Sequence, residues 1–205
     1  MVRGAATARI GGYVSLPIVA PGAVSQPPAA CAAIRNQSSN VSRVASERTR
    51  TYSWEDPLAL HGKMAGRSGL EVMQMMVSGE LSPPPIAETL GFRLVEATPG
   101  RAVFECEPEE FHYNPIGTVH AGLATTLMDS AMGLAFVTTL EAGVGWTTLE
   151  LKANFTRAMT VDTGLVRCIG SVIHPGRRVA TTEARIEDVG GRLYAHGTST
   201  ILVLA

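Results

Sequence analysis

The stretch His112–Leu140 reads HYNPIGTVHAGLATTLMDSAMGLAFVTTL and decides the fold prediction. It opens with a loop that contains Pro and Gly, and it continues as about twenty residues that are compatible with a helix. Between His120 and Glu141 the only charged side chain is Asp129. Five apolar residues recur at helical spacing and form one stripe: Leu123, Leu127, Ala131, Leu134 and Ala135.

Asp129 lies on the opposite side of this helical wheel. Its neighbours there are also small or apolar, so the helix is predicted to be buried on nearly every side. A lone carboxylate in a buried helix needs either a hydrogen-bonding partner or a chemical role, because burying an unpaired charge is costly.

The sequence after this helix alternates with period two. In Thr148–Arg157 apolar and polar residues alternate, which is typical of a half-buried strand. Short turns join most of the strands, so the predicted fold class is α+β, with an antiparallel β-sheet wrapped around one long central helix. The other predicted strands are Phe92–Ala97, Ala102–Glu107, Gly164–His174, Val179–Glu187 and Leu193–Val203.

The N-terminal part of the chain has a different composition. Residues 1–50 contain six Arg, one acidic residue and no Lys, so we expect a disordered extension, with an organellar transit segment as the alternative. Residues 51–67 are predicted to be a linker, and residues 68–205 the folded domain. That domain begins with a short amphipathic helix at Ser68–Gly79, followed by an extended connection at Ser82–Ile86.

The composition argues against several classes of protein. The chain has 205 residues, 45% of them hydrophobic, and a net charge of −1, so neither nucleic acid nor a membrane is expected as a partner. A membrane span of about eighteen uncharged apolar residues is also missing. The three cysteines lie far apart and the five histidines lack metal-binding spacing. We therefore expect a cytoplasmic protein with no metal and no cofactor.

The spacing of His120 and Asp129 limits how they can cooperate. Nine residues of helix separate two positions by roughly 13 Å and place them on opposite faces. Either the two side chains act separately, or the site combines residues from two subunits. Uncovered sheet edges also favour a homodimer or homotetramer. The helix N-terminus near His120–Gly122 offers free N–H groups to a carbonyl oxygen that acquires negative charge.

The loop and helix together resemble a known family. The run Asn114–Gly122 (NPIGTVHAG), followed by Asp129 nine residues after the histidine, is similar to the HNxxGxxHGG motif and helix Asp of PaaI-like (phenylacetate-pathway) thioesterases. The resemblance extends from about Ser68 to Leu204. It implies the hotdog fold and hydrolysis of the thioester bond of an aromatic or medium-chain acyl-CoA, with coenzyme A present only as part of the substrate.

The resemblance also implies catalytic roles. Asp129 would act as general base or nucleophile, while Asn114 and His120 would place the thioester carbonyl and the water. Ala121 stands where the family has the first Gly of HGG, and its N–H would bind the oxyanion. Alanine is harmless there if the residue lies in the first helical turn, but it would be strained in a left-handed conformation.

Supporting positions follow from the same resemblance. Thr148, with Thr147 as the alternative, would assist beside the Asp. The substrate-binding positions are a loop glycine, a glycine at the start of the helix, and two arginines near the coenzyme A phosphates: Gly117, Gly122, Arg177 and Arg178. Several of these residues have a structural alternative: a capping carboxylate for Asp129, helix-start packing for His120, an Asx-turn for Asn114, a plain strand position for Thr148, and solvated turn charges for the two arginines.

Two other functions are compatible with the same fold. One is an acyl-CoA sensor without catalytic activity, although residues 1–60 show no helical period for a DNA-binding motif. The other is a hydratase or dehydratase acting on a thioester, whose family patterns of acidic residues and His differ from this one. The acyl pocket is predicted to be lined by Met128, Met132, Phe136 and Trp146.

Overall fold

The computed structural model describes residues 47–204 of the chain. The predictions for residues 1–46, including the transit segment, lie outside this range. The α-helices are α1 (Pro57–Met64), α2 (Gly69–Ser78), α3 (Pro85–Leu90) and α4 (Ala121–Val137), and the 3₁₀ turns are η2 (Glu110–His112) and η3 (Val161–Thr163). The strands are β1 (Phe92–Thr98), β2 (Arg101–Cys106), β3 (Gly145–Phe155), β4 (Val166–His174), β5 (Val179–Asp188) and β6 (Leu193–Leu204).

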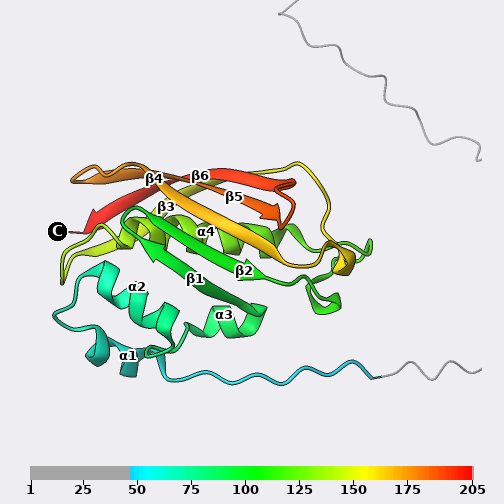
Figure 1. Ribbon diagram of the computed structural model, residues 1–205, viewed down its shortest axis with the longest axis horizontal. Helices are drawn as coiled ribbons and strands as arrows, with labels where there is room; N and C mark the ends of the chain where they lie inside the picture. The colour runs from blue at the N-terminus through cyan, green and yellow to red at the C-terminus, as the bar shows by residue number, and fades with distance from the viewer. Residues whose placement is uncertain (1–46, 205) are drawn as a thin grey trace, which may run out of the picture. The chain divides into compact units, whose positions relative to one another are not determined.

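All six strands form one antiparallel sheet in the order β1-β2-β4-β5-β6-β3. Figure 1 shows the sheet curved around α4. The predicted α+β class and all six strands are confirmed. The largest shift in a boundary is at β3, which begins at Gly145 rather than Thr148. No helix among residues 47–204 is long and apolar enough to cross a membrane.

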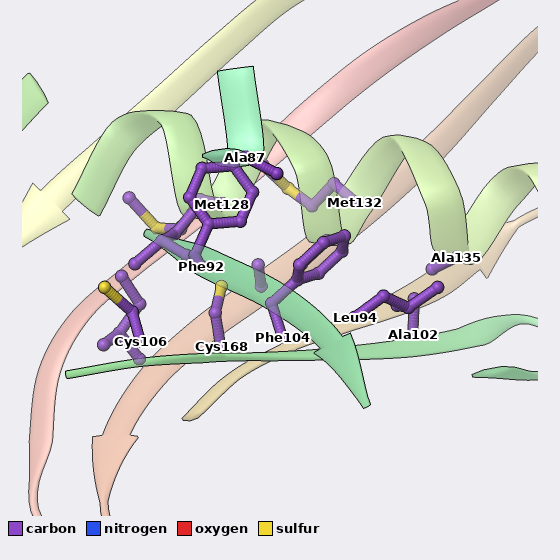
Figure 2. Packing of buried hydrophobic residues seen from close by; sticks show 14 of the residues in the cluster. Ala87, Phe92, Leu94, Ala102, Phe104, Cys106, Met128, Met132, Ala135 and Cys168 are labelled. Atoms are coloured by element: carbon purple, nitrogen blue, oxygen red, sulfur yellow. The ribbon is translucent and has the colours of Figure 1, made fainter. Parts of the chain in front are cut away.

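The core lies between α4 and the concave face of the sheet. Met128 and Met132 are fully buried, and Figure 2 shows them directed toward Phe92 of β1 and Phe104 of β2. The two phenyl rings meet edge to face with their centroids 5.6 Å apart. Each large apolar side chain buried in this way contributes about 1.5–3 kcal/mol to stability. This packing fixes the rotation of α4 about its axis and therefore decides which of its residues face away from the sheet.

Helix α2 begins and ends where the sequence predicts. The Ser68 hydroxyl accepts a hydrogen bond from the Glu71 N–H, and the Glu71 carboxylate accepts one from the Ser68 N–H at 2.8 Å. The Ser68 N–H and the Ser68 hydroxyl both donate to the Glu71 carboxylate, and these two bonds lower the pKa of Glu71. Gly79 ends the helix in a left-handed conformation with φ +82°. The Gly69 N–H donates to the Leu140 carbonyl and so docks the start of α2 beyond the end of α4.

Two segments differ from their predictions. The extended connection predicted for Ser82–Ile86 stops at Pro84, because α3 begins at Pro85, and proline is favoured in the first turn of a helix. The segment predicted as a linker contains α1, capped by the Asp56 carboxylate, which accepts from the Leu58 N–H at 2.9 Å. Leu60 of α1 is buried in the core. An eight-residue helix is too short for its periodicity to be recognised in the sequence.

The two edges of the sheet differ in how they are covered. Strand β1 contacts α2 and α3, which lie beside it. Strand β3 spans 11 residues, and within residues 47–204 it pairs only with β6. Two large apolar side chains on it are exposed, Leu149 at 55% and Phe155 at 51%. A long, exposed edge with apolar side chains favours pairing with another strand.

Candidate active site

Asp129 of α4 has a polar partner on the neighbouring strand. The Thr148 hydroxyl of β3 donates a hydrogen bond to Asp129 Oδ1 at 3.0 Å. The adjacent Thr147 is exposed, and the alternation of side chains along a strand directs it to the other face. The structure thus brings Thr148, not Thr147, next to the carboxylate.

The surroundings of Asp129 differ from the prediction of burial on all sides. In a single protomer Asp129, Ala121 and Gly122 are exposed, while the opposite stripe of α4 packs on the sheet. The prediction that α4 is buried on nearly every side is therefore wrong for the Asp129 side of a single chain. Two half-buried threonines next to this side donate their hydroxyl hydrogens within the helix: Thr125 to the Ala121 carbonyl and Thr126 to the Gly122 carbonyl.

His120 is the N-cap residue of α4. Its Nδ1 accepts a hydrogen bond from the Gly122 N–H at 2.8 Å, and its carbonyl accepts from the Leu123 N–H at 3.0 Å. A Cβ atom on residue 122 would lie 2.8 Å from this Nδ1, so only glycine leaves room for the cap. Among the described residues the Ala121 N–H has no hydrogen-bond partner. Ala121 is the first helical residue, so it needs no left-handed backbone.

Asn114 organises the loop before the helix. Its Oδ1 accepts hydrogen bonds from the backbone N–H groups of Ile116 at 3.0 Å and Thr118 at 3.2 Å, and its Nδ2 donates to the Thr118 hydroxyl at 2.9 Å. Gly117 has φ +81°, a left-handed conformation that favours glycine in this turn. The side chain of Asn114 thus bonds within its own loop, as in an Asx-turn.

His112 is buried and fixes the base of this loop, a role that the sequence left undecided. Its Nδ1 accepts from the Glu109 N–H at 2.9 Å, and its Nε2 lies 2.8 Å from the Leu90 carbonyl. These partners require the neutral tautomer with its hydrogen on Nε2. The His112 carbonyl accepts from the His120 N–H at 2.8 Å, so the start of α4 depends on this residue. The only signal in the sequence is its position two residues before Asn114.

The titration of His112 predicts how stability depends on pH. Burial is the main cause that lowers the pKa of His112 below its ordinary value of 6.5. Below that pH the unfolded chain binds a proton before the folded chain does, so stability falls as the pH drops from 6.5 toward the folded-state pKa. We expect the melting temperature to decrease over this range, by roughly 2–4 °C for each kcal/mol lost.

A His112→Gln variant should be less stable at pH 7 and should lose part of this dependence on pH. Thermal melts between pH 7.5 and pH 5 would measure it. His174 lies exposed at the end of β4, so His174→Gln should follow the wild-type curve. A His112→Gln curve parallel to that of the wild type would contradict the prediction.

The described cysteines do not offer a nucleophile. Cys106 of β2 and Cys168 of β4 are buried in the core. Burial raises the pKa of Cys106 to about 12 and raises that of Cys168 as well. Neither thiol ionises readily at neutral pH. Residues 47–204 also contain no cluster of three or more His, Cys, Asp or Glu side chains suited to a metal ion.

The two predicted coenzyme A arginines lie two strands away from β3: the Arg178 carbonyl accepts a hydrogen bond from the Val203 N–H at 3.0 Å, and Val203 is paired with Trp146. Arg177 and Arg178 occupy the turn between β4 and β5, and both are exposed. Neither forms an ion pair within the described part of the chain. Both guanidinium groups are therefore accessible to an external anion, as well as to solvent.

An apolar cleft of about 430 Å³ opens between the helices α1 and α2, the C-terminal half of α4 and the start of β3. Trp146, one of the four residues predicted for the acyl pocket, lines this cleft and packs on Gly133, where a Cβ would lie 2.7 Å from the indole. The other three predicted pocket residues, Met128, Met132 and Phe136, are instead buried in the core. The prediction for them is wrong because the rotation of α4 directs them toward the sheet. The apolar residues lining the cleft include Met64, Val72, Met73, Leu134 and Val137.

The part of the chain that carries the candidate site is similar to known proteins. The family model of the thioesterase superfamily matches residues 116–195, which include α4 and Asp129. Human acyl-coenzyme A thioesterase 13 is 31% identical over 108 residues, which cover 52% of this chain and 76% of that protein. The chain belongs to the thioesterase superfamily. The chain is also 28% identical to the 1,4-dihydroxy-2-naphthoyl-CoA hydrolase of Listeria monocytogenes over 118 residues, which cover 58% of this chain and 94% of that enzyme.

A solved structure supports the narrower assignment. A variant of the phenylacetic acid degradation protein PaaI from Thermus thermophilus superimposes with a TM-score of 0.54 and 30% identity, covering 59% of this chain and 100% of that one. The predicted PaaI-like hotdog thioesterase is thereby confirmed. Both named relatives are hydrolases of coenzyme A thioesters, and the enzyme class of this family is thioester hydrolase.

Proposed function

We propose that this thioesterase hydrolyses an acyl-CoA with Asp129 as the general base, at a site completed by the loop and helix N-terminus of a second copy. The observation that carries the proposal is the hydrogen bond between Asp129 and Thr148. Asp129 lies on the exposed side of α4, together with the small residues Ala121 and Gly122. The Thr148 hydroxyl holds one carboxylate oxygen and leaves the other available to a water molecule.

The chemistry follows from these groups. Asp129 takes a proton from water as the water oxygen attacks the thioester carbonyl carbon. The resulting oxyanion would accept a hydrogen bond from the free Ala121 N–H at the positive end of α4. Collapse of the tetrahedral intermediate breaks the carbon–sulfur bond, and the proton held by Asp129 passes to the departing coenzyme A thiolate. Water, the substrate and these residues supply every atom, so the proposal needs no further cofactor.

The need for a second copy rests on distance. Ala121 and Asp129 are eight residues apart on one helix, which separates them by roughly 12 Å along its axis. Both groups must lie about 3 Å from the reacting atoms, so they cannot serve the same thioester carbonyl from one chain. His120 and Asn114 belong to the Ala121 end of the helix and would act from the same subunit as Ala121.

The open edge at β3 suggests how the second copy binds. Antiparallel pairing of β3 with its own symmetry mate would continue the sheet and bring two α4 helices side by side in opposite directions. The N-terminus of one helix would then approach Asp129 of the other, and Leu149 and Phe155 would be covered. A dimer of this kind would also remove water from Asp129. We propose a homodimer as the minimal active unit, either alone or within a tetramer.

The apolar cleft beside Trp146 is the proposed site of the acyl group. Gly133 follows Asp129 by one turn on the same face of α4, and Trp146 precedes Thr148 by two residues on the same face of β3. The Trp146 wall of the cleft therefore lies on the same side of α4 as the carboxylate, although Asp129 itself does not line the cleft. Its volume is typical of sites for small apolar ligands. These features support an aromatic or medium-chain acyl group as the substrate class.

Removal of the indole is expected to change acyl preference. In Trp146→Ala the cleft would extend past Gly133, so kcat/KM should rise for longer acyl chains relative to shorter ones by about tenfold or more. Release of free thiol from a panel of phenylacetyl-, benzoyl- and straight-chain acyl-CoAs measures the shift. Trp54, the other tryptophan, is 54% exposed, so Trp54→Ala is the matched control. An unchanged acyl profile in Trp146→Ala would place the acyl group elsewhere.

The same panel tests the function itself. The wild-type protein should release coenzyme A thiol from at least one of these acyl groups at rates proportional to enzyme concentration. His120→Ala and Asn114→Ala should lower turnover less severely than the removal of the Asp129 carboxylate. Binding of acyl-CoA without release of thiol from any member of the panel would contradict the hydrolase proposal and favour a sensor.

A further inference from the structure

Arg50, which precedes every helix and strand of the described chain, binds the C-terminal end of α3. Its Nη1 donates to the Thr89 carbonyl at 2.5 Å and its Nη2 to the Glu88 carbonyl at 2.9 Å. Carbonyl groups at a helix C-terminus lack partners within the helix and carry partial negative charge, so a guanidinium fork is well suited to them. A Cβ on Gly91 would lie 3.3 Å from Nη2, so the glycine also leaves space for Arg50.

The same guanidinium contacts the loop that leads to the active site. Its central carbon lies 4.2 Å from the centroid of the Phe111 ring and 4.8 Å from that of Tyr52. Both distances are within the range of cation–π attraction. Arg50 therefore joins three separate parts of the chain: its own segment, the end of α3 and η2.

A short path of contacts connects this cluster with the start of α4. The Phe111 and His112 rings lie with their centroids 3.9 Å apart. His112 is held on the Leu90 carbonyl, one residue beyond the carbonyls that bind Arg50. Its own carbonyl accepts the His120 N–H at 2.8 Å. A shift of Phe111 would thus move His112 and, through it, the N-cap residue of the helix.

We propose that Arg50 is a positioning residue for the active site, and that the segment ahead of the hotdog domain is part of the support of the catalytic loop. Arg50 acts through Phe111 and His112 on His120 and the Ala121 N–H. The inference rests on the proposed function of that loop. Arg50 lies well outside residues 116–195, the part that matches the family model. The proposed support of the catalytic loop therefore comes from a segment that the family model does not include.

The test uses Arg50→Ala and Arg50→Lys in the full-length protein. Lysine keeps the charge but loses both the planar fork and the stacking on Phe111, so it should not rescue the loss. We expect kcat to fall by about tenfold in both variants, because a small displacement of an oxyanion donor is costly, with KM changed by less than about twofold. Arg185→Ala is the matched control, since Arg185 pairs with Glu187 on β5 at 3.0 Å.

Two further measurements separate positioning from general stability. In a Phe111→Leu background, Arg50→Ala should have little additional effect on kcat, because the contact through which it acts is already lost. The imidazole NMR signals of His112 should shift in Arg50→Ala while those of His174 stay in place, and this readout does not depend on turnover.

The outcomes distinguish this inference from the proposed function. Wild-type kcat in both Arg50 variants would overturn the inference, even if their melting temperatures fell. Unchanged turnover in His120→Ala would overturn the role of the loop and thus the proposed site, whatever Arg50 does. A loss of kcat in Arg50→Ala that Arg50→Lys fully restores would show that charge alone matters and would also overturn the positioning role.

Discussion

Replacement of Asp129 by Asn should lower thiol release by roughly 10²–10⁴-fold while the protein stays folded. Asparagine has the same shape, and its Oδ1 can still accept the hydrogen bond from the Thr148 hydroxyl, which is 3.0 Å long in the wild type. It can neither take a proton from water nor attack a carbonyl carbon. The measurement is turnover with the best acyl-CoA of the panel, together with the melting temperature and the oligomeric state.

A pair of threonine variants sharpens this test. Thr148→Val removes the partner of Asp129 and should lower kcat by about tenfold, because the carboxylate loses one of its positioning bonds. Thr147→Val changes the neighbouring exposed residue of β3 in the same way and should leave kcat unchanged. Retention of most activity in Asp129→Asn would rule out Asp129 as base or nucleophile. Oxygen-labelled water in a single turnover would separate these two roles, since only a nucleophile leaves label in the carboxylate.

Asp129→Asn and Ala121→Pro should each be inactive alone, and a mixture of the two proteins should regain activity. Ala121→Pro removes the N–H proposed for the oxyanion, and proline is tolerated at the first helical position. The preceding His120 already has the extended backbone that proline requires, with ψ 134°. Alone, this variant should lose roughly 10²–10³-fold in kcat.

The mixture tests whether each site is shared between subunits. A heterodimer of Asp129→Asn with Ala121→Pro has one site with both an intact Asp129 and an intact Ala121, and one site with neither. Random exchange of subunits places half of the chains in heterodimers, so about a quarter of wild-type turnover should return. Failure to recover activity after demonstrated subunit exchange would mean that each site lies within one chain. Asp129→Asn mixed with itself is the control.

A good part of the fold could be predicted because its determinants are local. The strands are defined by alternation over a few residues, α2 by Ser68 and Gly79 at its ends, and the stripe of α4 by its helical period. Segments without such a signal were missed. Helix α3 begins at the third of three consecutive prolines and has only six residues, and α1 has only eight, so neither has a period that can be recognised.

The sequence by itself predicted the α+β class from its periodicities, and it predicted the hotdog fold, the thioesterase family and the candidate site residues from a short motif that resembles the PaaI-like family. Only the tertiary structure decided which residues meet. Asp129 meets Thr148 because β3 packs beside α4, nineteen residues later in the chain. Met128 and Met132 belong to the core and not to the pocket, since the sheet fixes the rotation of the helix. Contacts such as that of Arg50 with Phe111 join residues with no periodic relation, so no pattern in the sequence could reveal them.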